Sequence, residues 1–250
     1  MQKNNNNSRL IALLVGVALI LLFVWILPFN SSNKDYIKTI SADFITNIHI
    51  NANLGDIHIL PIEGNELTVR MESESKKKIK GYKLSLKEKN NRVTINAKKK
   101  SKFGLSGKLP FDFKLIVEVP VKQYDLLKVN SNVSTIYVDS ITANKFELQT
   151  NVGHIHLNTT TGFIYAETNV GDINMQLNTI LNDIIAETQV GNVSVKIAEV
   201  PASLQTDLKN SIGNTMESLP NMQNGSIGVG GPIVKLTSEV GNIELTLMDH

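Results

Sequence analysis

The chain contains no cysteine among its 250 residues. This absence excludes disulfide bonds, thiolate metal sites and a cysteine nucleophile. The chain also contains no HExxH, GxSxG or phosphate-loop motif, and it lacks the GGxGxDx repeat of calcium-binding β-rolls. The sequence therefore predicts no catalytic residue, no cofactor and no metal site, and stability has to come from packing.

Long hydrophobic runs are scarce, but one is present near the N-terminus. Residues 10–27 contain eighteen residues without a charge, which is enough to cross a bilayer as a helix. Lys3 and Arg9 precede this run, so the positive-inside rule keeps the N-terminal stub in the cytoplasm. A cleaved signal peptide is the alternative, although "LPFNSSNKD" after the run lacks a small-x-small cleavage site.

These features predict a cell-membrane protein with one pass and an extracytoplasmic main domain. The predicted boundaries are a cytoplasmic stub at 1–9, a transmembrane signal anchor at 10–28, a linker at 29–40, an N-terminal β region at 41–125 and regular repeats at 126–250.

Helical periodicity is absent after residue 30, and a repeat takes its place. The stretches "QTNVGHIHL" (149–157), "ETNVGDINM" (167–175) and "ETQVGNVSV" (187–195) are nearly the same nine residues. Aligned glycines recur at spacings of 18, 20, 22 and 28 residues, namely Gly153, Gly171, Gly191, Gly213 and Gly241. Two further copies are "NANLGDIHI" (51–59) and "NSNVSTIYV" (130–138), the latter with Ser134 in the glycine position.

Apolar and polar residues alternate on both sides of each glycine, which indicates two strands joined by a tight corner. A repeat of about 18–22 residues built in this way predicts an all-β fold, a parallel β-solenoid in which each coil buries its inner face against its neighbours. The residues three before the glycine are small and polar, and we expect each to bond its equivalent on the next coil: Ser131, Thr150, Thr168, Thr188, Asn210 and Ser238. The Asp, Asn or His after the glycine suits a left-handed corner.

The two ends of the repeat are less regular. Upstream, "LTVRME", "YKLSLKEK", "RVTINAK" and "FKLIVEVP" predict strands that form the first, wider coils or a separate small β-domain. In the fourth coil, Thr215 and Glu217 replace buried apolar residues, and residues 218–232 predict an excursion before a last strand pair at 233–247. We expect that last pair to be an open final rung, covered by the loop or paired with another chain.

Charge is concentrated in one segment. Residues 76–108 contain 13 Lys or Arg and one acid, a net charge of +12, against −10 for the remainder. One interpretation is a solvated edge whose lysines prevent aggregation. The other is a surface that binds anionic cell-wall polymer, acidic glycan or lipid headgroups, with candidate residues Lys76, Lys77, Lys78, Lys80, Lys83, Lys98, Lys99, Lys100 and Lys102. Nucleic acid lies in the other compartment and is not an expected partner.

Two smaller clusters contain side chains that are capable of chemistry. Glu167 and Glu187 share a column of the repeat and would lie about 5 Å apart, as in a retaining glycosidase, but a solvated face is the simpler interpretation. His154 and His156 share one face and could hold a metal with Asp172 on the next coil, although a solvated surface pair is the simpler interpretation.

The segment "FKLIVEVPVKQYDLLKVNSNVSTIYV" (113–138) and the recurring "VGDI", "VGNV" and "VGNI" resemble the bacterial putative adhesin family with its LiaG-like domain of unknown function. The resemblance covers roughly residues 44–247, and Ser134 departs from the usual glycine. It implies an envelope-located, all-β repeat protein with no established catalytic residue.

Together these observations predict a non-enzymatic envelope interaction or adhesin-like module. An envelope-stress signalling accessory that binds a membrane protein through residues 218–232 or the final rung is the alternative. A glycan-cleaving enzyme at Glu167 and Glu187 is the third.

Overall fold

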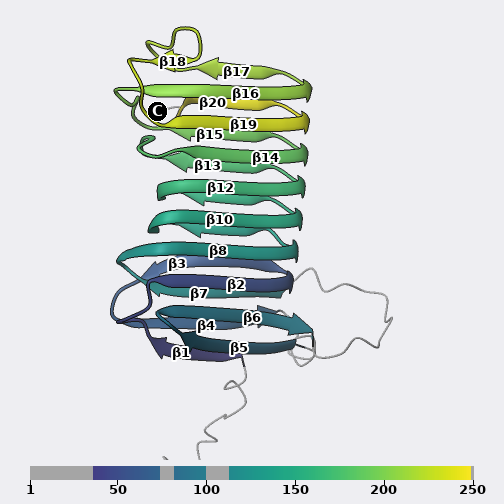
Figure 1. Ribbon diagram of the computed structural model, residues 1–250. Helices are drawn as coiled ribbons and strands as arrows, with labels where there is room; N and C mark the ends of the chain where they lie inside the picture. Colours follow the sequence, from purple (N-terminus) through teal and green to yellow (C-terminus); the bar gives the residue numbers. More distant parts are fainter. Residues whose placement is uncertain (1–35, 74–81, 100–112, 249–250) are drawn as a thin grey trace, which may run out of the picture. The chain divides into compact units, whose positions relative to one another are not determined.

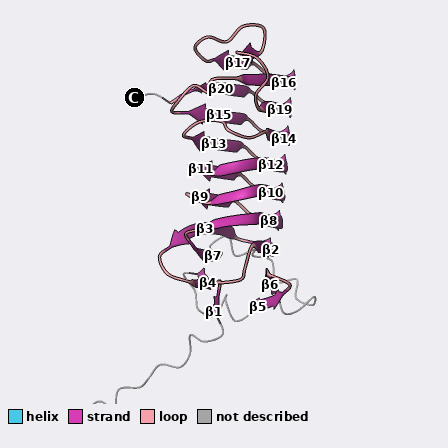
Figure 2. Ribbon diagram, turned by 60° about the vertical axis from the view of Figure 1, so that its left-hand side comes forward, coloured by secondary structure: helices cyan, strands magenta, loops and turns pink. Residues whose placement is uncertain are grey.

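The computed structural model describes residues 36–73, 82–99 and 113–248, and these contain strands and loops without a helix (Figures 1 and 2). The predicted anchor at 10–28 lies outside the described residues. No helix within the described ranges is long and apolar enough to cross a membrane. The first strand begins at Ile37, inside the predicted linker.

The strands form two ten-stranded sheets. The first sheet contains, in spatial order, β1 (Ile37–Ser41), β4 (Glu66–Ser73), β7 (Phe113–Pro120), β3 (Asp56–Ile62), β9 (Ile136–Asp139), β11 (Ile155–Asn158), β13 (Ile173–Leu177), β15 (Val193–Ile197), β20 (Ile243–Leu247) and β17 (Thr215–Ser218). The second contains β18 (Ser226–Ile227), β16 (Leu204–Ile212), β19 (Ile233–Val240), β14 (Ile184–Val190), β12 (Thr161–Val170), β10 (Thr142–Val152), β8 (Gln123–Val133), β2 (Asn47–Leu54), β6 (Arg92–Lys99) and β5 (Tyr82–Lys89).

Alternating side chains decide which face of each strand is buried. In β12, Ile164, Ala166 and Thr168 point into the space between the sheets, whereas Tyr165 and Glu167 point outward. The inward residues of both sheets form one core, mostly of Ile, Val and Leu, within a compact unit that spans residues 35–250. Each coil therefore contributes one strand to each sheet and leaves an outer face on both sides.

The strand register follows the glycine alignment of the sequence. Leu148 pairs with Ala166, Ala166 with Ala186, and Ala186 with Leu236. The repeat copy around Gly55 has the same register, because Ile50 of β2 lies opposite Val129 of β8. The repeat found in the sequence is thus the repeat of coils that stack in parallel (Figure 1).

The coils do not stack in chain order at either end. The last strand pair, β19 and β20, lies between the β14–β15 coil and the β16–β17 coil. The expectation that this pair is the open final rung is therefore wrong, because the final rung is β16–β17. This position explains the polar Thr215 and Glu217, which sit on a terminal strand exposed along its whole length.

The N-terminal β region shows the same kind of insertion. The β2–β3 coil lies between β8–β9 on one side and β6 and β7 on the other. β4, β5, β6 and β7 extend the two sheets of the repeat, so the alternative of a separate β-domain does not hold. The region also departs from the all-parallel expectation, since β1 with β4, β4 with β7, and β5 with β6 are antiparallel.

The loop at 219–231 covers the C-terminal end of the stack, as one of the two expectations for it proposed. Leu219 and Ile227 are buried, and Met222 packs against the same core. The hydroxyl of Thr206 donates to the carbonyl of Gly225 at 3.0 Å, and β18 pairs with the start of β16. This end of the core is therefore capped by the chain itself.

Close backbone approach at the corners makes glycine necessary there. Gly171 has φ of +149°, and a Cβ on it would lie 2.1 Å from the carbonyl oxygen of Gly153 on the preceding coil. The N–H of Gly171 donates to the carbonyl of Val190 on the following coil at 2.9 Å. Any side chain at this corner would push neighbouring coils apart.

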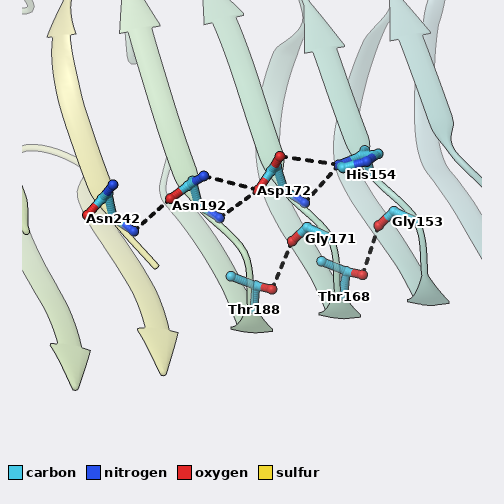
Figure 3. Close-up of polar contacts among 8 residues, drawn as sticks. All are labelled: Gly153, His154, Thr168, Gly171, Asp172, Thr188, Asn192 and Asn242. Atoms are coloured by element: carbon cyan, nitrogen blue, oxygen red, sulfur yellow. Dashed lines mark hydrogen bonds and ion pairs between the residues drawn. The ribbon is translucent and has the colours of Figure 1, made fainter. Parts of the chain in front are cut away.

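The buried hydroxyls bond these corners rather than one another, which corrects the predicted ladder. Thr168 donates to the carbonyl of Gly153 at 3.0 Å, and Thr188 donates to that of Gly171 at 3.0 Å (Figure 3). Equivalent residues are about 4.8 Å apart along the stack, which is too far for a direct hydroxyl contact, whereas the glycine carbonyl is within reach.

A second polar ladder runs along the outside of the same corner (Figure 3). The N–H of Asp172 donates to Nδ1 of His154, that of Asn192 to Oδ1 of Asp172, and that of Asn242 to Oδ1 of Asn192, at 2.8–3.0 Å. These residues do not have positive φ, so the predicted left-handed conformation is wrong and belongs to the glycine alone. Their side chains serve as acceptors for the next coil.

The valines that precede four of the corner glycines are exposed. Val152, Val170, Val190 and Val240 are 43–48% exposed. The chain turns at the next residue, so these side chains project along the edge between the two sheets. They form an apolar row on the outside of the stack.

We predict that Gly171→Ala destabilises the fold by more than about 2 kcal/mol, because it adds both an unfavourable φ and a collision with a neighbouring backbone. Gly64→Ala is the matched control, since Gly64 has φ of +104° but no atom within 4 Å of the added Cβ. Urea unfolding measures both variants. Equal losses would show that the collision contributes nothing.

Thr168→Val should cost about 1–3 kcal/mol, because it leaves the carbonyl of Gly153 without its hydroxyl donor in a buried position. Thr168→Ser keeps the donor and should cost clearly less. Thermal unfolding of the two variants tests this difference, and a valine variant as stable as the serine variant would refute it.

Candidate anion-binding face

The antiparallel strands β5 and β6 place a set of cations on the outer face of the second sheet. Asn90 and Asn91, with φ of 53° and 59°, form the two-residue turn between them. The alternation buries Tyr82, Leu84 and Val93 and turns the other parity outward. We call the outward cations the basic face: Lys83, Lys87, Lys89, Arg92 and Lys98.

Like charges lie directly opposite each other on this face. Lys83 pairs with Lys98, and Lys89 pairs with Arg92, in the antiparallel register. Such pairs are unfavourable in a sheet, where oppositely charged pairs would be stabilising. Within the described residues, no ion pair joins the five side chains to a carboxylate. Glu88 alternates with Lys87 and Lys89 along β5, so it does not lie on the same face of the sheet. The basic face is therefore free to bind an anion.

His49 lies on β2, next to β6, and its pKa is affected by the positive charge of the basic face. Burial is the main cause that lowers this pKa, and the positive charges of Arg92 and Lys128 lower it further. Its Nε2 is buried without a hydrogen-bond partner among the described residues. Lys128 differs from the cations of the basic face because it donates to Glu147 at 2.7 Å.

The structure brings two of the predicted lysines together, Lys83 and Lys98. Of the others, Lys76, Lys77, Lys78, Lys80, Lys100 and Lys102 lie outside the described residues, as does the side chain of Lys99. Lys87, Lys89 and Arg92 also belong to the basic face, although the sequence prediction did not include them as site residues. Their alternation with buried residues along β5 and β6 is the sequence feature that indicates their outward position.

Glu167 and Glu187 pair in register on adjacent strands, as the sequence predicted. Each carboxylate is engaged separately: Glu167 accepts from Gln149 at 2.7 Å and from the hydroxyl of Tyr165 at 2.8 Å. Glu187 accepts from Lys235 at 2.7 Å, and this contact raises the pKa of Lys235. A recess of about 230 Å³ beside Glu167 is lined by Asn130, Gln149 and other polar residues and does not include Glu187. The two glutamates thus serve as links between coils.

His154 and His156 lie with ring centroids 6.0 Å apart, and Asp172 Oδ2 is 3.5 Å from Nδ1 of His154. Nδ1 of His154 already accepts the N–H of Asp172, so the proton of the neutral ring belongs on Nε2. That tautomer presents no free lone pair toward a metal. Among the described residues, no group of three His, Asp or Glu side chains could hold a metal ion.

His156 instead belongs to a stack of rings on the first sheet. Its ring lies 4.9 Å from that of Tyr137, which lies 4.5 Å from that of His58, with interplanar angles of 9° and 17°. Burial is the main cause that lowers the pKa of both histidines. Electrostatic repulsion from His154 lowers the pKa of His156 further, and repulsion from Lys114 lowers that of His58 further. The stack joins three neighbouring strands, β3, β9 and β11.

The fold and the basic face define an all-β, two-sheeted repeat protein with a cationic edge. Residues 123–246 match the family model described as Toastrack DUF4097, so this part of the chain is similar to that family. The match confirms the resemblance to an adhesin-type family of unknown function that the glycine motifs indicated. No curated protein matches the chain.

The solved structures that are similar to this chain include two bacterial proteins. One is a "putative cell adhesion protein" from Clostridium sporogenes ATCC 15579, with 14% identity, a TM-score of 0.49, and coverage of 85% of this chain and 98% of that one. The other is a "putative adhesin" from Bacteroides fragilis NCTC 9343, with 14% identity, a TM-score of 0.45, and coverage of 85% and 96% respectively.

Stability should fall at mildly acidic pH because His49, His58 and His156 have pKa values lowered by burial. A lowered pKa means that protonation favours the unfolded chain, so this part of the stability is complete above the unfolded value of about 6.5 and is lost as pH falls below it. Urea midpoints measured from about pH 7.5 to about pH 5.5 should therefore decrease. Changing all three histidines to Gln should flatten the profile between these limits, and an unchanged slope would contradict the assignment.

Proposed function

We propose that the protein is a non-enzymatic, adhesin-like module of the cell envelope, anchored by residues 10–28, whose basic face binds anionic cell-wall polymer or lipid headgroups. The observation that carries this proposal is the basic face itself: two opposed like-charge pairs that the described fold leaves without a carboxylate partner. Such pairs cost stability, and a bound polyanion removes that cost. The Toastrack DUF4097 match supports the adhesin-like class.

The proposed location rests on the sequence. The apolar run at 10–27 behind Lys3 and Arg9 supports a signal anchor with the repeat outside the membrane. Phosphates and carboxylates of the envelope are then the polyanions within reach. The engagement of Glu167 and Glu187 by separate neighbours supports a binding role over glycan cleavage.

The basic face should bind isolated cell walls or acidic vesicles in a salt-sensitive manner. Full-length protein in non-ionic detergent is sedimented with cell walls, and protein reconstituted without detergent is tested with vesicles, each across a salt series. Binding should weaken steeply with salt, since exposed charges are screened over about 8 Å at physiological ionic strength. Changing Lys83, Lys87, Lys89, Arg92 and Lys98 to Gln should abolish it.

Changing the four lysines of this set to Arg is the matched control, because it keeps every charge and should preserve binding. Neutralising five cations elsewhere, Lys128, Lys145, Lys196, Lys209 and Lys235, each of which is ion-paired, should leave binding in place. Full binding by the five-Gln variant would overturn the proposal.

A second candidate, a signalling accessory that binds a membrane protein, is favoured by one side chain. Val229 is 98% exposed and lies between Gly228 and Gly230 in the loop that covers the C-terminal end of the stack. We expect Val229→Asp to remove a cross-link to such a partner while leaving wall or vesicle binding unchanged. Persistence of the cross-link in this variant would dismiss the loop as the contact.

A further inference from the structure

The stack has a basal end, formed by β1 in the first sheet and β5 in the second. These are the edge strands of the two sheets and they contact each other (Figure 1). The end differs from the opposite one, where Leu219, Met222 and Ile227 of the capping loop cover the core. Among the described residues, the last apolar layer at the basal end is Tyr36, Ile40 and Leu86, all half-buried.

The edge of this end is both apolar and cationic. Ile37 of β1 is 42% exposed, and Lys38 beside it is half-buried. β5 brings Lys83, Lys87 and Lys89 of the basic face to the same end. A second copy docking end to end would oppose these lysines to one another, so the charge selects an anionic partner.

An acidic bilayer surface has the required chemistry. Its phosphates attract lysines, and the boundary beneath them accepts apolar side chains. Lysine side chains are long enough to reach phosphate while their methylene stems cover apolar residues. A cell-wall polymer offers the anions without an apolar layer.

The length of the connecting chain agrees with this partner. Nine residues, 28–36, separate the apolar run from β1. Fully extended, they span at most about 32 Å. The distal strand β17 lies nine strand spacings from β1, which is about 43 Å along the stack. With residues 10–27 in a bilayer, as proposed above, a tether of this length would hold the basal end closer to the membrane than the opposite end.

We propose that the basal end rests on acidic lipid headgroups, so that the two-sheet stack stands on the bilayer with its capped end outward. This inference rests on the proposed membrane anchor and narrows the anion of the basic face to lipid phosphate. It assigns the half-buried layer of Tyr36, Ile40 and Leu86 to the lipid interface.

The absence of cysteine allows a direct test, because one introduced cysteine is the sole labelling site. Full-length Ile37→Cys and Val229→Cys are labelled with a fluorophore and reconstituted into vesicles that carry a headgroup quencher. In vesicles containing phosphatidylglycerol, the label at position 37 should lose most of its emission and the label at position 229 should keep it. In phosphatidylcholine vesicles, or at high salt, the loss at position 37 should diminish.

The controls separate the possible failures. Flotation of the vesicles after an alkaline wash reports the anchor alone, and protein that fails to float overturns the anchor and this inference with it. Protein that floats but shows equal emission at both positions in both lipids overturns the docking of the basal end only.

The five-Gln variant of the basic face should float normally and lose the phosphatidylglycerol-dependent quenching, whereas unchanged quenching would contradict the role given to the lysines. Wall binding without lipid-dependent quenching would support the proposed function and reject lipid as the anion.

Discussion

The close approach of backbones at the glycine corner is the constraint on which the rest of the structure depends. At the glycine corners one coil lies on the next with no room for a Cβ: a Cβ added to Gly191 or Gly171 would lie 2.0 Å or 2.1 Å from a carbonyl oxygen of the preceding coil. The inner hydroxyls and the outer Asp and Asn side chains then bond across the same junction. Because every coil must match its neighbour here, the parallel coils keep the same register, and equivalent outward residues line up on neighbouring strands.

The two ends of the stack show how the chain handles the loss of a neighbour. At the C-terminal side, the final coil has Thr215 and Glu217 at positions where the other coils have apolar residues. The loop that follows covers the core at this end. At the N-terminal side, antiparallel strands replace the corners, and the chain places its unpaired cations there. The difference between a capped end and a charged end gives the molecule a direction, which a membrane-tethered module would use to present one end outward.

The repeat itself could be predicted because its cause is local. Glycine, an apolar alternation and a fixed spacing report the corner, the two strands and the parallel register directly. The position of the β19–β20 coil between β14–β15 and β16–β17 could not be predicted from the sequence. The coils have similar sequences, so the repeat pattern does not report their order in space. The hydroxyl ladder was misassigned for a similar reason: sequence shows that Thr168 and Thr188 share a column, but not that a corner carbonyl lies closer than the next hydroxyl. The segment 76–108 was found by its charge, whereas the opposed pairs within it became visible only through the antiparallel register of β5 and β6.

Binding of an anion to the basic face would change the side-chain pKa of His49. This ring lies beside β6, and its pKa is lowered by burial and by the charges of Arg92 and Lys128. An anion bound at the face favours the imidazolium form. NMR titration of the full-length protein with and without anionic polymer or acidic lipid should show that the pKa of His49 rises on binding and returns at high salt. The pKa of His156, on the opposite sheet, should stay constant. If the pKa of His49 is the same with and without the anion, the basic face is not the binding surface.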